Sequence, residues 1–162
     1  ALGPDNGGQG EKDKADYLIN YLKKIDCDEI YELNAPDKRV SCGYRPNIVA
    51  KIYGENRSKT LWIISHTDIV PPGDQALWNT DPFVLEVQGD LLIGRGVEDN
   101  HQGIVSSLLL ATSIRQLNLI PDLSLGLLFV ADEETGSRYG LDYVLTNHGH
   151  LFSKDDLFLV PD

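Results

Sequence analysis

The chain contains four short apolar runs, and each leads into side chains that can bind a metal ion. Apolar runs of this length, bounded by polar residues, glycine or proline, are typical of buried strands. In open α/β sheets, ligands bind at the edge formed by the carboxyl ends of the strands. We therefore expect one histidine and several carboxylates to meet at one edge of a sheet. The runs and the side chains that follow them are residues 61–64 with His66 and Asp68, 91–93 with Asp99, 125–130 with Glu133 and Glu134, and 157–160 with Asp162.

Other segments have the periodicities of helices and further strands. Apolar residues recur at helical spacing over residues 11–25, with lysines and aspartates between them, which predicts an amphipathic helix. Residues 103–117 are apolar on almost every side, so we expect this helix to pack against the sheet rather than lie exposed. Strands that alternate with helices indicate an α/β layered domain. The remaining expected elements are strands at 29–33 and 47–53, a hairpin at 82–93 and a short helix at 141–145.

The composition agrees with one globular domain, because 41% of the 162 residues are apolar and 24% are charged. A net charge of −11 argues against nucleic acid and anionic membranes as partners, since both are negative. No run approaches the roughly 20 apolar residues of a membrane span. Cys27 and Cys42 match no zinc or redox spacing, so we interpret them as reduced thiols of a cytoplasmic protein. The glycine-rich residues 1–10 lack the apolar core of a signal peptide and are expected to form a flexible tail.

His66 and Asp68 have a spacing that suits a metal site. Imidazole is the commonest nitrogen ligand in such sites, and a nearby carboxylate fixes its tautomer and orientation. Residues two apart at the end of a strand can face the same side. The alternative for this pair alone is a surface histidine beside an aspartate that caps a helix.

Asp99 and the pair Glu133-Glu134 add carboxylates with different possible roles. Asp99 could bridge two cations through its two oxygens, or it could cap the helix that follows. Adjacent glutamates at the end of a buried strand need cations or a proton to be tolerated. One glutamate can bind a metal while the other takes a proton from bound water. The structural alternative is two solvated glutamates at the turn of residues 135–137.

Five motifs in a fixed order resemble those of the M20 family of metallopeptidases and amidohydrolases: SHTDIVPPG, WNTDPF, GRGVEDN, ADEETGS and VPD. This family includes succinyl-diaminopimelate desuccinylase, acetylornithine deacetylase and carboxypeptidase G2. The resemblance covers residues 11–162 and is to the amino-terminal part of the catalytic domain. It implies a three-layer αβα fold of the zinc-exopeptidase type, with a central mixed sheet flanked by helices.

The resemblance also implies a site with two zinc ions, for which cobalt or manganese could substitute. A water that bridges the metals would attack the amide bond of a small N-acyl amino acid or dipeptide. The family holds the peptide bond that matches Asp99-Asn100 in the cis form. The implied catalytic residues are Glu133, the general base, and Asp68, which orients His66; the implied ligands are His66 and Asp162 for one zinc, Glu134 for the other, and Asp99 between them.

The sequence departs from the family pattern in two places. His101 and Gln102 stand where the family commonly has lysine and glycine, and we interpret His101 as a rim or capping residue. The chain also stops at Asp162, before the lid domain and a last histidine ligand of family members. We therefore expect this fragment to be inactive alone and the full-length form to be a homodimer through the lid. Two alternatives remain, a noncatalytic metal-binding or interaction domain and an aminopeptidase-like di-zinc exopeptidase.

Overall fold

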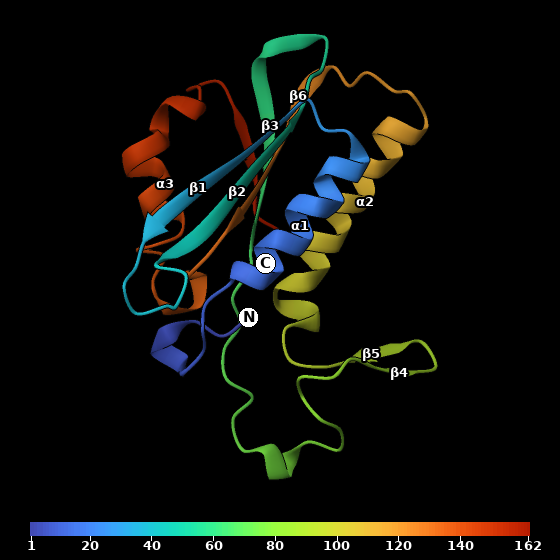
Figure 1. Cartoon of the computed structure of the whole chain (residues 1–162). Helices are drawn as coiled ribbons and strands as arrows, with labels where there is room; N and C mark the ends of the chain where they lie inside the picture. The colour runs from blue at the N-terminus through green and yellow to red at the C-terminus, as the bar shows by residue number, and fades with distance from the viewer.

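The computed structural model describes residues 1–162 and contains a five-stranded mixed sheet (Figure 1). The strand order is β1-β2-β6-β3-β7, with β6, β3 and β7 parallel and the β1-β2 and β2-β6 pairs antiparallel. Leu61 lies opposite Leu125 on one side and Leu157 on the other, so the three parallel strands end at the same edge. Three of the four predicted runs are thus confirmed as strands of one sheet. The strands are β1 (Glu29–Pro36), β2 (Tyr44–Ile52), β3 (Asn56–His66), β6 (Leu123–Val130) and β7 (Leu157–Leu159).

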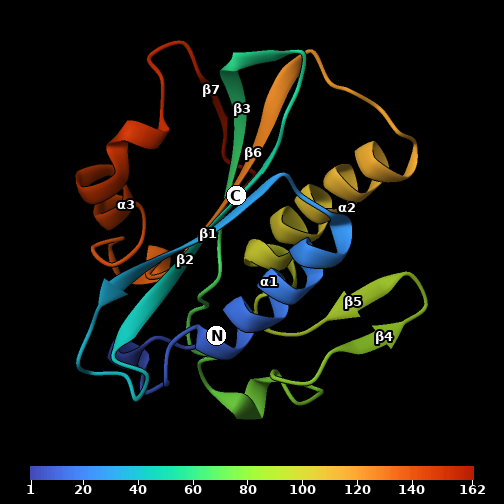
Figure 2. The same cartoon turned by 45° about the horizontal axis from the view of Figure 1, so that its top comes forward.

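Helices cover both faces of this sheet, which confirms the predicted three-layer αβα arrangement. α1 (Lys12–Ile25) and α2 (Gly103–Gln116) lie side by side on one face, and α3 (Leu141–His148) lies on the other (Figures 1 and 2). The larger core cluster joins α1 and α2 to the sheet with 16 buried residues. The smaller one, with seven buried residues that include Trp62 and Val144, lies on the α3 side. The domain therefore has a separate core on each face of the sheet.

The prediction that α2 packs against the sheet is confirmed, but only one side of the helix is buried. Ile104, Leu108 and Ala111 are buried against the sheet and α1, as expected. Val105 and Leu109, on a different side of the helix, are exposed. The reason is geometric, because a helix at the surface of a layer can bury only the stripe that faces the sheet and its neighbouring helix.

The remaining apolar run, residues 91–93, belongs to a separate hairpin rather than to the central sheet. β4 (Glu86–Gln88) and β5 (Leu91–Ile93) form a two-stranded antiparallel ribbon, so the predicted hairpin is confirmed. Gly89 takes a positive φ of 60° at the turn, where glycine carries no steric penalty. The prediction of a buried strand at 91–93 is wrong, since Leu91 and Leu92 are exposed. Asp99 nevertheless reaches the edge of the central sheet through the loop that follows.

β1 and β2 are longer than we predicted from the sequence. Both strands include a proline, a residue that strands usually exclude, so the predicted strands ended before it or began after it. Pro36 ends β1, which is an edge strand and therefore tolerates a residue without an N–H group. Pro46 lies in the part of β2 that precedes its pairing with β6 at residues 48–52. Neither proline interrupts a ladder on both sides.

Residues 1–10 fold back onto the domain instead of extending as the expected tail. Arg39 Nη1 donates to both Asp5 oxygens, at 2.8 and 2.9 Å, and the Ile69 N–H donates to the Ala1 carbonyl oxygen at 2.9 Å. None of the helices has the length and apolar character needed to cross a bilayer. The short helical turns are η1 (Pro4–Asn6), η2 (Gln75–Leu77), η3 (Val97–Gln102), η4 (Glu133–Thr135) and η5 (Gly149–Leu151).

Candidate metal centre

His66, the last residue of β3, is buried at the edge where the parallel strands end. Its Nε2 atom lies 2.7 Å from Asp99 Oδ1 and 3.6 Å from Asp162 Oδ1. Its Nδ1 atom lies 3.4 Å from Asp68 Oδ1 and 3.2 Å from the Asp68 carbonyl oxygen. Carboxylates from three segments of the chain therefore surround one imidazole, as the sequence predicted.

The electrostatics at His66 favour a cation. Burial alone would lower the pKa of His66, but the hydrogen bonds and charges of Asp68 and Asp99 outweigh burial and raise the pKa to about 9. Only an unprotonated imidazole nitrogen binds a metal, so a metal ion at Nε2 would take the place of the ring proton. The same carboxylates that hold the proton would stabilise the metal.

Asp68 connects His66 to the turn that carries the two glutamates. Its carboxylate accepts the Glu133 N–H at 3.0 Å and the Glu134 N–H at 3.1 Å, besides lying next to the His66 ring. Burial would raise the pKa of Asp68, but the bond to His66 and the two N–H donors lower it below its ordinary value. Asp68 thus stays ionised and orients both sides of the site, whereas the sequence predicted only its contact with His66.

Glu133 and Glu134 follow β6 in the short turn η4. Burial is the main cause that raises the pKa of both side chains, and neighbouring carboxylates add to it: Asp162 and Asp68 for Glu133, Asp99 and Asp68 for Glu134. His66 opposes the rise in both cases. Glu134 Oε1 is buried with no hydrogen-bond partner. A buried acceptor of this kind fits a metal ligand, because a cation would satisfy it.

The donor set at this edge fits a divalent metal. Two groups of three side chains have ligand atoms within 4.8 Å of one another, and one imidazole nitrogen with two carboxylate oxygens is an ordinary set for zinc. All six predicted site residues are therefore brought together. This differs from the expected arrangement in two ways. His66, rather than Asp99, belongs to both groups. Glu133, expected to be the general base, has a carboxylate oxygen within ligand distance of the His66 and Asp162 ligand atoms. The groups are His66, Glu133 and Asp162, and His66, Asp99 and Glu134.

Asn100 is a site residue that the sequence reasoning missed. It follows Asp99 across a cis peptide bond, as the family resemblance implied, and its side chain is buried. Asn100 Nδ2 donates to the Pro161 carbonyl oxygen at 2.6 Å and to Asp162 Oδ1 at 3.1 Å. Asn100 thereby holds Asp162 beside His66. Its position in the GRGVEDN motif, directly after the proposed ligand Asp99, could have indicated that Asn100 belongs to the site.

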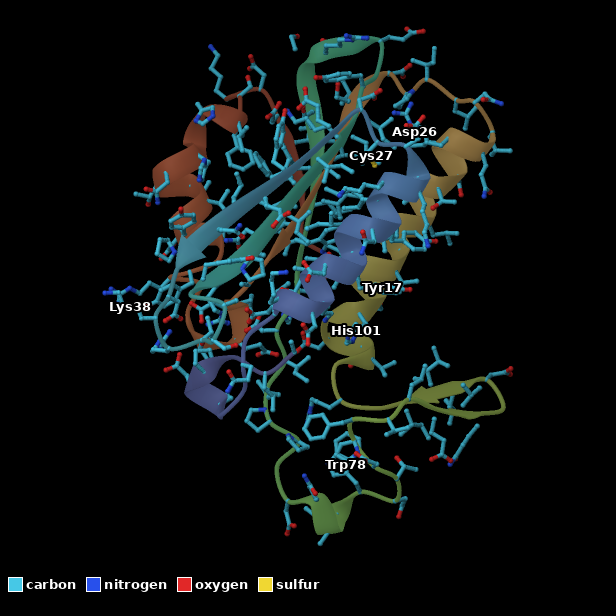
Figure 3. All side chains as sticks on the ribbon, viewed as in Figure 1. Tyr17, Asp26, Cys27, Lys38, Trp78 and His101 are labelled. Atoms are coloured by element: carbon cyan, nitrogen blue, oxygen red, sulfur yellow. The ribbon has the colours of Figure 1, made fainter.

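The other histidines do not belong to the ligand groups. His101 lies where the start of α2 meets α1 (Figure 3), and its Nδ1 atom hydrogen-bonds the Gly96 carbonyl oxygen. Burial is the main cause that lowers the pKa of His101. This position agrees with the rim role that we expected. His148 and His150 lie together at the end of α3, with ring centroids 6.2 Å apart.

Trp78, in the WNTDPF motif, makes contacts within its own loop and with Arg95. Its Nε1 atom donates to the Pro72 carbonyl oxygen at 2.9 Å, and the Arg95 guanidinium lies 5.5 Å from the centre of its ring. Figure 3 places Trp78 in the long loop that precedes the hairpin. These contacts link two segments of the loop without supplying a ligand.

A small cavity opens directly at the candidate centre. It has a volume of about 130 Å³, and His66, Glu133 and Asp162 line it. A larger and mostly apolar cavity lies between the β4-β5 hairpin and the start of α2, but it contains none of the ligand side chains. We assign the chemistry to the smaller cavity, because one complete ligand group lines it and the pKa of Glu133 in that group is raised.

Comparison with known proteins finds relatives that are named as a metallohydrolase and as a desuccinylase. An uncharacterized metallohydrolase of Methanococcus maripaludis is 47% identical over 100% of this chain and 40% of its own length. A probable succinyl-diaminopimelate desuccinylase of Staphylococcus aureus is 30% identical over 88% of this chain and 34% of its own length. The chain thus spans about 40% or less of these curated relatives.

A solved structure gives the same result at the level of the fold. The M20 family metallo-carboxypeptidase of Sulfolobus solfataricus superposes with a TM-score of 0.74 and 25% identity, over 94% of this chain and 33% of that chain. Residues 62–159 match peptidase family M20/M25/M40. That segment contains five of the six site residues, from His66 to Glu134. It ends three residues before the sixth, Asp162. The chain therefore belongs to peptidase family M20/M25/M40.

Proposed function

We propose that the protein containing this chain hydrolyses amide bonds with two zinc ions held at this edge of the sheet. The observation that supports the proposal most strongly is the pair of three-residue ligand groups that meet at His66. His66, Asp99, Glu134 and Asp162 would hold the metals. Bound zinc lowers the pKa of a water toward neutrality and polarises the scissile carbonyl group.

Glu133 is the proposed general base. It takes a proton from the attacking water and returns it to the leaving amine. Burial and nearby carboxylates raise the pKa of Glu133, and a general base works best when its pKa lies close to the working pH. The bond from its backbone N–H to Asp68, at 3.0 Å, fixes the turn that carries the carboxylate.

The proposed substrates are N-acyl amino acids or dipeptides. Two findings support them, since one relative is named a desuccinylase and one similar structure is a carboxypeptidase. Because the chain spans about 40% of the length of its relatives, this activity belongs to the longer protein. We propose that the longer protein is a homodimer and that the 162-residue chain alone does not hydrolyse amides.

The experiment is Glu133→Gln in the longer protein, assayed on N-acyl amino acids, dipeptides and peptides with a free amino terminus. The amide keeps the shape of the side chain but cannot accept a proton. We expect kcat to fall at least about 100-fold while the zinc content stays unchanged. Glu55→Gln, in the exposed loop between β2 and β3, is the matched control and should keep full activity.

Two outcomes would change the proposal. Loss of bound zinc in Glu133→Gln would make Glu133 a ligand, and unchanged turnover would remove it from the reaction. Hydrolysis confined to peptides with a free amino terminus would assign the protein to the aminopeptidase-like class instead.

A further inference from the structure

A buried ionic network that the proposed mechanism does not use lies next to the glutamate turn. Arg45 on β2 and Glu11, just before α1, are both fully buried and form an ion pair. Arg45 Nε donates to Glu11 Oε2 at 2.6 Å, and Nη2 donates to Glu11 Oε1. Arg45 Nη1 donates to Asp132 Oδ1 at 3.3 Å. Arg45 Nη1 also lies 4.0 Å from Asp37 Oδ2. One cation therefore joins three carboxylates, of which Glu11 and Asp132 are 121 residues apart in the sequence.

Asp132 is the residue through which this network reaches the site. It stands directly before Glu133 and takes a positive φ of 62°, where the chain turns out of β6. Its Oδ1 atom accepts from Thr135 Oγ1, and its Oδ2 atom accepts the Tyr139 N–H at 3.0 Å. Its carbonyl oxygen accepts the Ser137 N–H at 2.6 Å. The Asp132 carboxylate thus organises the whole turn that carries Glu133.

The turn is held at two positions. Asp68 accepts hydrogen bonds from the backbone N–H groups of Glu133 and Glu134. Arg45 donates to the side chain of Asp132, the residue directly before Glu133. Two short acidic side chains next to each other repel, so a turn held only by Asp68 could shift and carry both carboxylates away from the imidazole. Residues that hydrogen-bond to the segment carrying a metal ligand, without binding the metal themselves, set the position of that ligand.

We propose that Arg45 is a positioning residue, which acts through Asp132 to hold the Glu133-Glu134 turn in the geometry of the metal centre. The inference rests on the proposed metal-binding function of that centre. Arg45 suits this task because its planar guanidinium offers several donors in a rigid arrangement and stays charged when buried. Glu11 balances its charge and fixes its orientation.

The test measures cobalt(II) binding to the 162-residue chain, by calorimetry and by the visible absorption of the bound ion. The decisive variants are Asp132→Asn, which removes the charge that Arg45 holds, and the double variant Glu11→Gln with Arg45→Gln, which removes the ion pair without changing the net charge. Both should weaken cobalt binding by about 10–100-fold and change the absorption spectrum. Binding is measured at a temperature where circular dichroism shows each variant to be folded.

Arg115→Gln is the matched control, because Arg115, at the C-terminal end of α2, pairs with Asp28 and has no ion pair with Glu11 or Asp132. It should keep the cobalt affinity and spectrum of the wild type. If Arg45 only stabilised the fold, the variants would have a lower melting temperature but would bind cobalt as tightly as the wild type when folded. Unchanged cobalt binding by folded Asp132→Asn would overturn the inference, even if the double variant did not fold. Absence of cobalt binding in the wild-type chain would instead overturn the proposed metal centre, and with it this inference.

Discussion

At the scale of single residues, the site depends on a close approach between Asn100 and the first residue of α2. Asn100 holds Asp162 through its side-chain amide, at 3.1 Å. Gly103 leaves the room for this contact, since a Cβ atom there would lie 2.6 Å from Asn100 Oδ1 and 2.8 Å from the Pro161 carbonyl oxygen. The missing side chain of Gly103 is thus part of what places Asp162 beside His66.

We therefore expect Gly103→Ala to disturb both stability and metal binding. The added methyl group must displace Asn100 or the backbone at Pro161, which should lower the free energy of unfolding by about 1–3 kcal/mol. Because Asp162 moves with Asn100, zinc binding by the chain should weaken by about tenfold. Chemical denaturation and calorimetric titration measure the two effects.

Gly149→Ala is the control for this substitution. A Cβ atom at Gly149 would meet nothing within 4 Å, and its φ of −56° suits any residue. We expect its free energy of unfolding to change by less than about 1 kcal/mol. Equal stability of the two alanine variants would show that the crowding at Gly103 relaxes without cost.

That the potential metal ligands lie close together could be predicted from the sequence, but the residues that contact them and their turn inside the fold could not. His66, Asp99, Glu133 and Glu134 have ligand or base chemistry and follow apolar runs or glycine turns. Arg45 and Asn47 lie inside a strand, where their polar side chains gave no indication of a partner in the turn after β6. Asn47 Oδ1 accepts the Ala131 N–H at 3.0 Å, a contact that only the fold brings together.

At the scale of elements, α2 is apolar on two sides but buries only one. Leu108 is 8% exposed and belongs to the core, whereas its neighbour Leu109 is 64% exposed. Periodicity could not distinguish these two sides, because both carry leucine, isoleucine or valine. The separate position of the β4-β5 hairpin was equally hidden, since a short apolar run reads the same in a core strand and in an exposed ribbon.

Alanine substitution of two adjacent leucines of α2 tests whether the helix buries only one side. We expect Leu108→Ala to lower the free energy of unfolding by about 2–5 kcal/mol, because it removes a buried side chain from the core. Leu109→Ala should change the free energy by no more than about 0.5 kcal/mol, since alanine also favours the helix. Denaturant unfolding of both variants provides the comparison. Equal losses would mean that both sides of α2 are packed in solution.

At the scale of the whole molecule, the chain forms a three-layer αβα arrangement and spans about 40% of the length of one curated relative. Both ligand groups share one imidazole. Nδ1 of His66 lies against Asp68, so Nε2 is the one nitrogen of this ring directed toward the other carboxylates. A second metal would have to rely on carboxylates alone. We therefore expect this chain to bind a single zinc ion tightly.

Calorimetric titration of zinc into the metal-free chain and into its His66→Gln variant shows whether a metal centre is built around His66. We expect one tight site in the wild type. We expect zinc binding at least about 100-fold weaker in the variant, because loss of a ligand costs more than loss of a residue that only positions a ligand. Equal zinc affinity in the two chains, or the absence of a tight site in the wild type, would mean that His66 does not organise a metal centre.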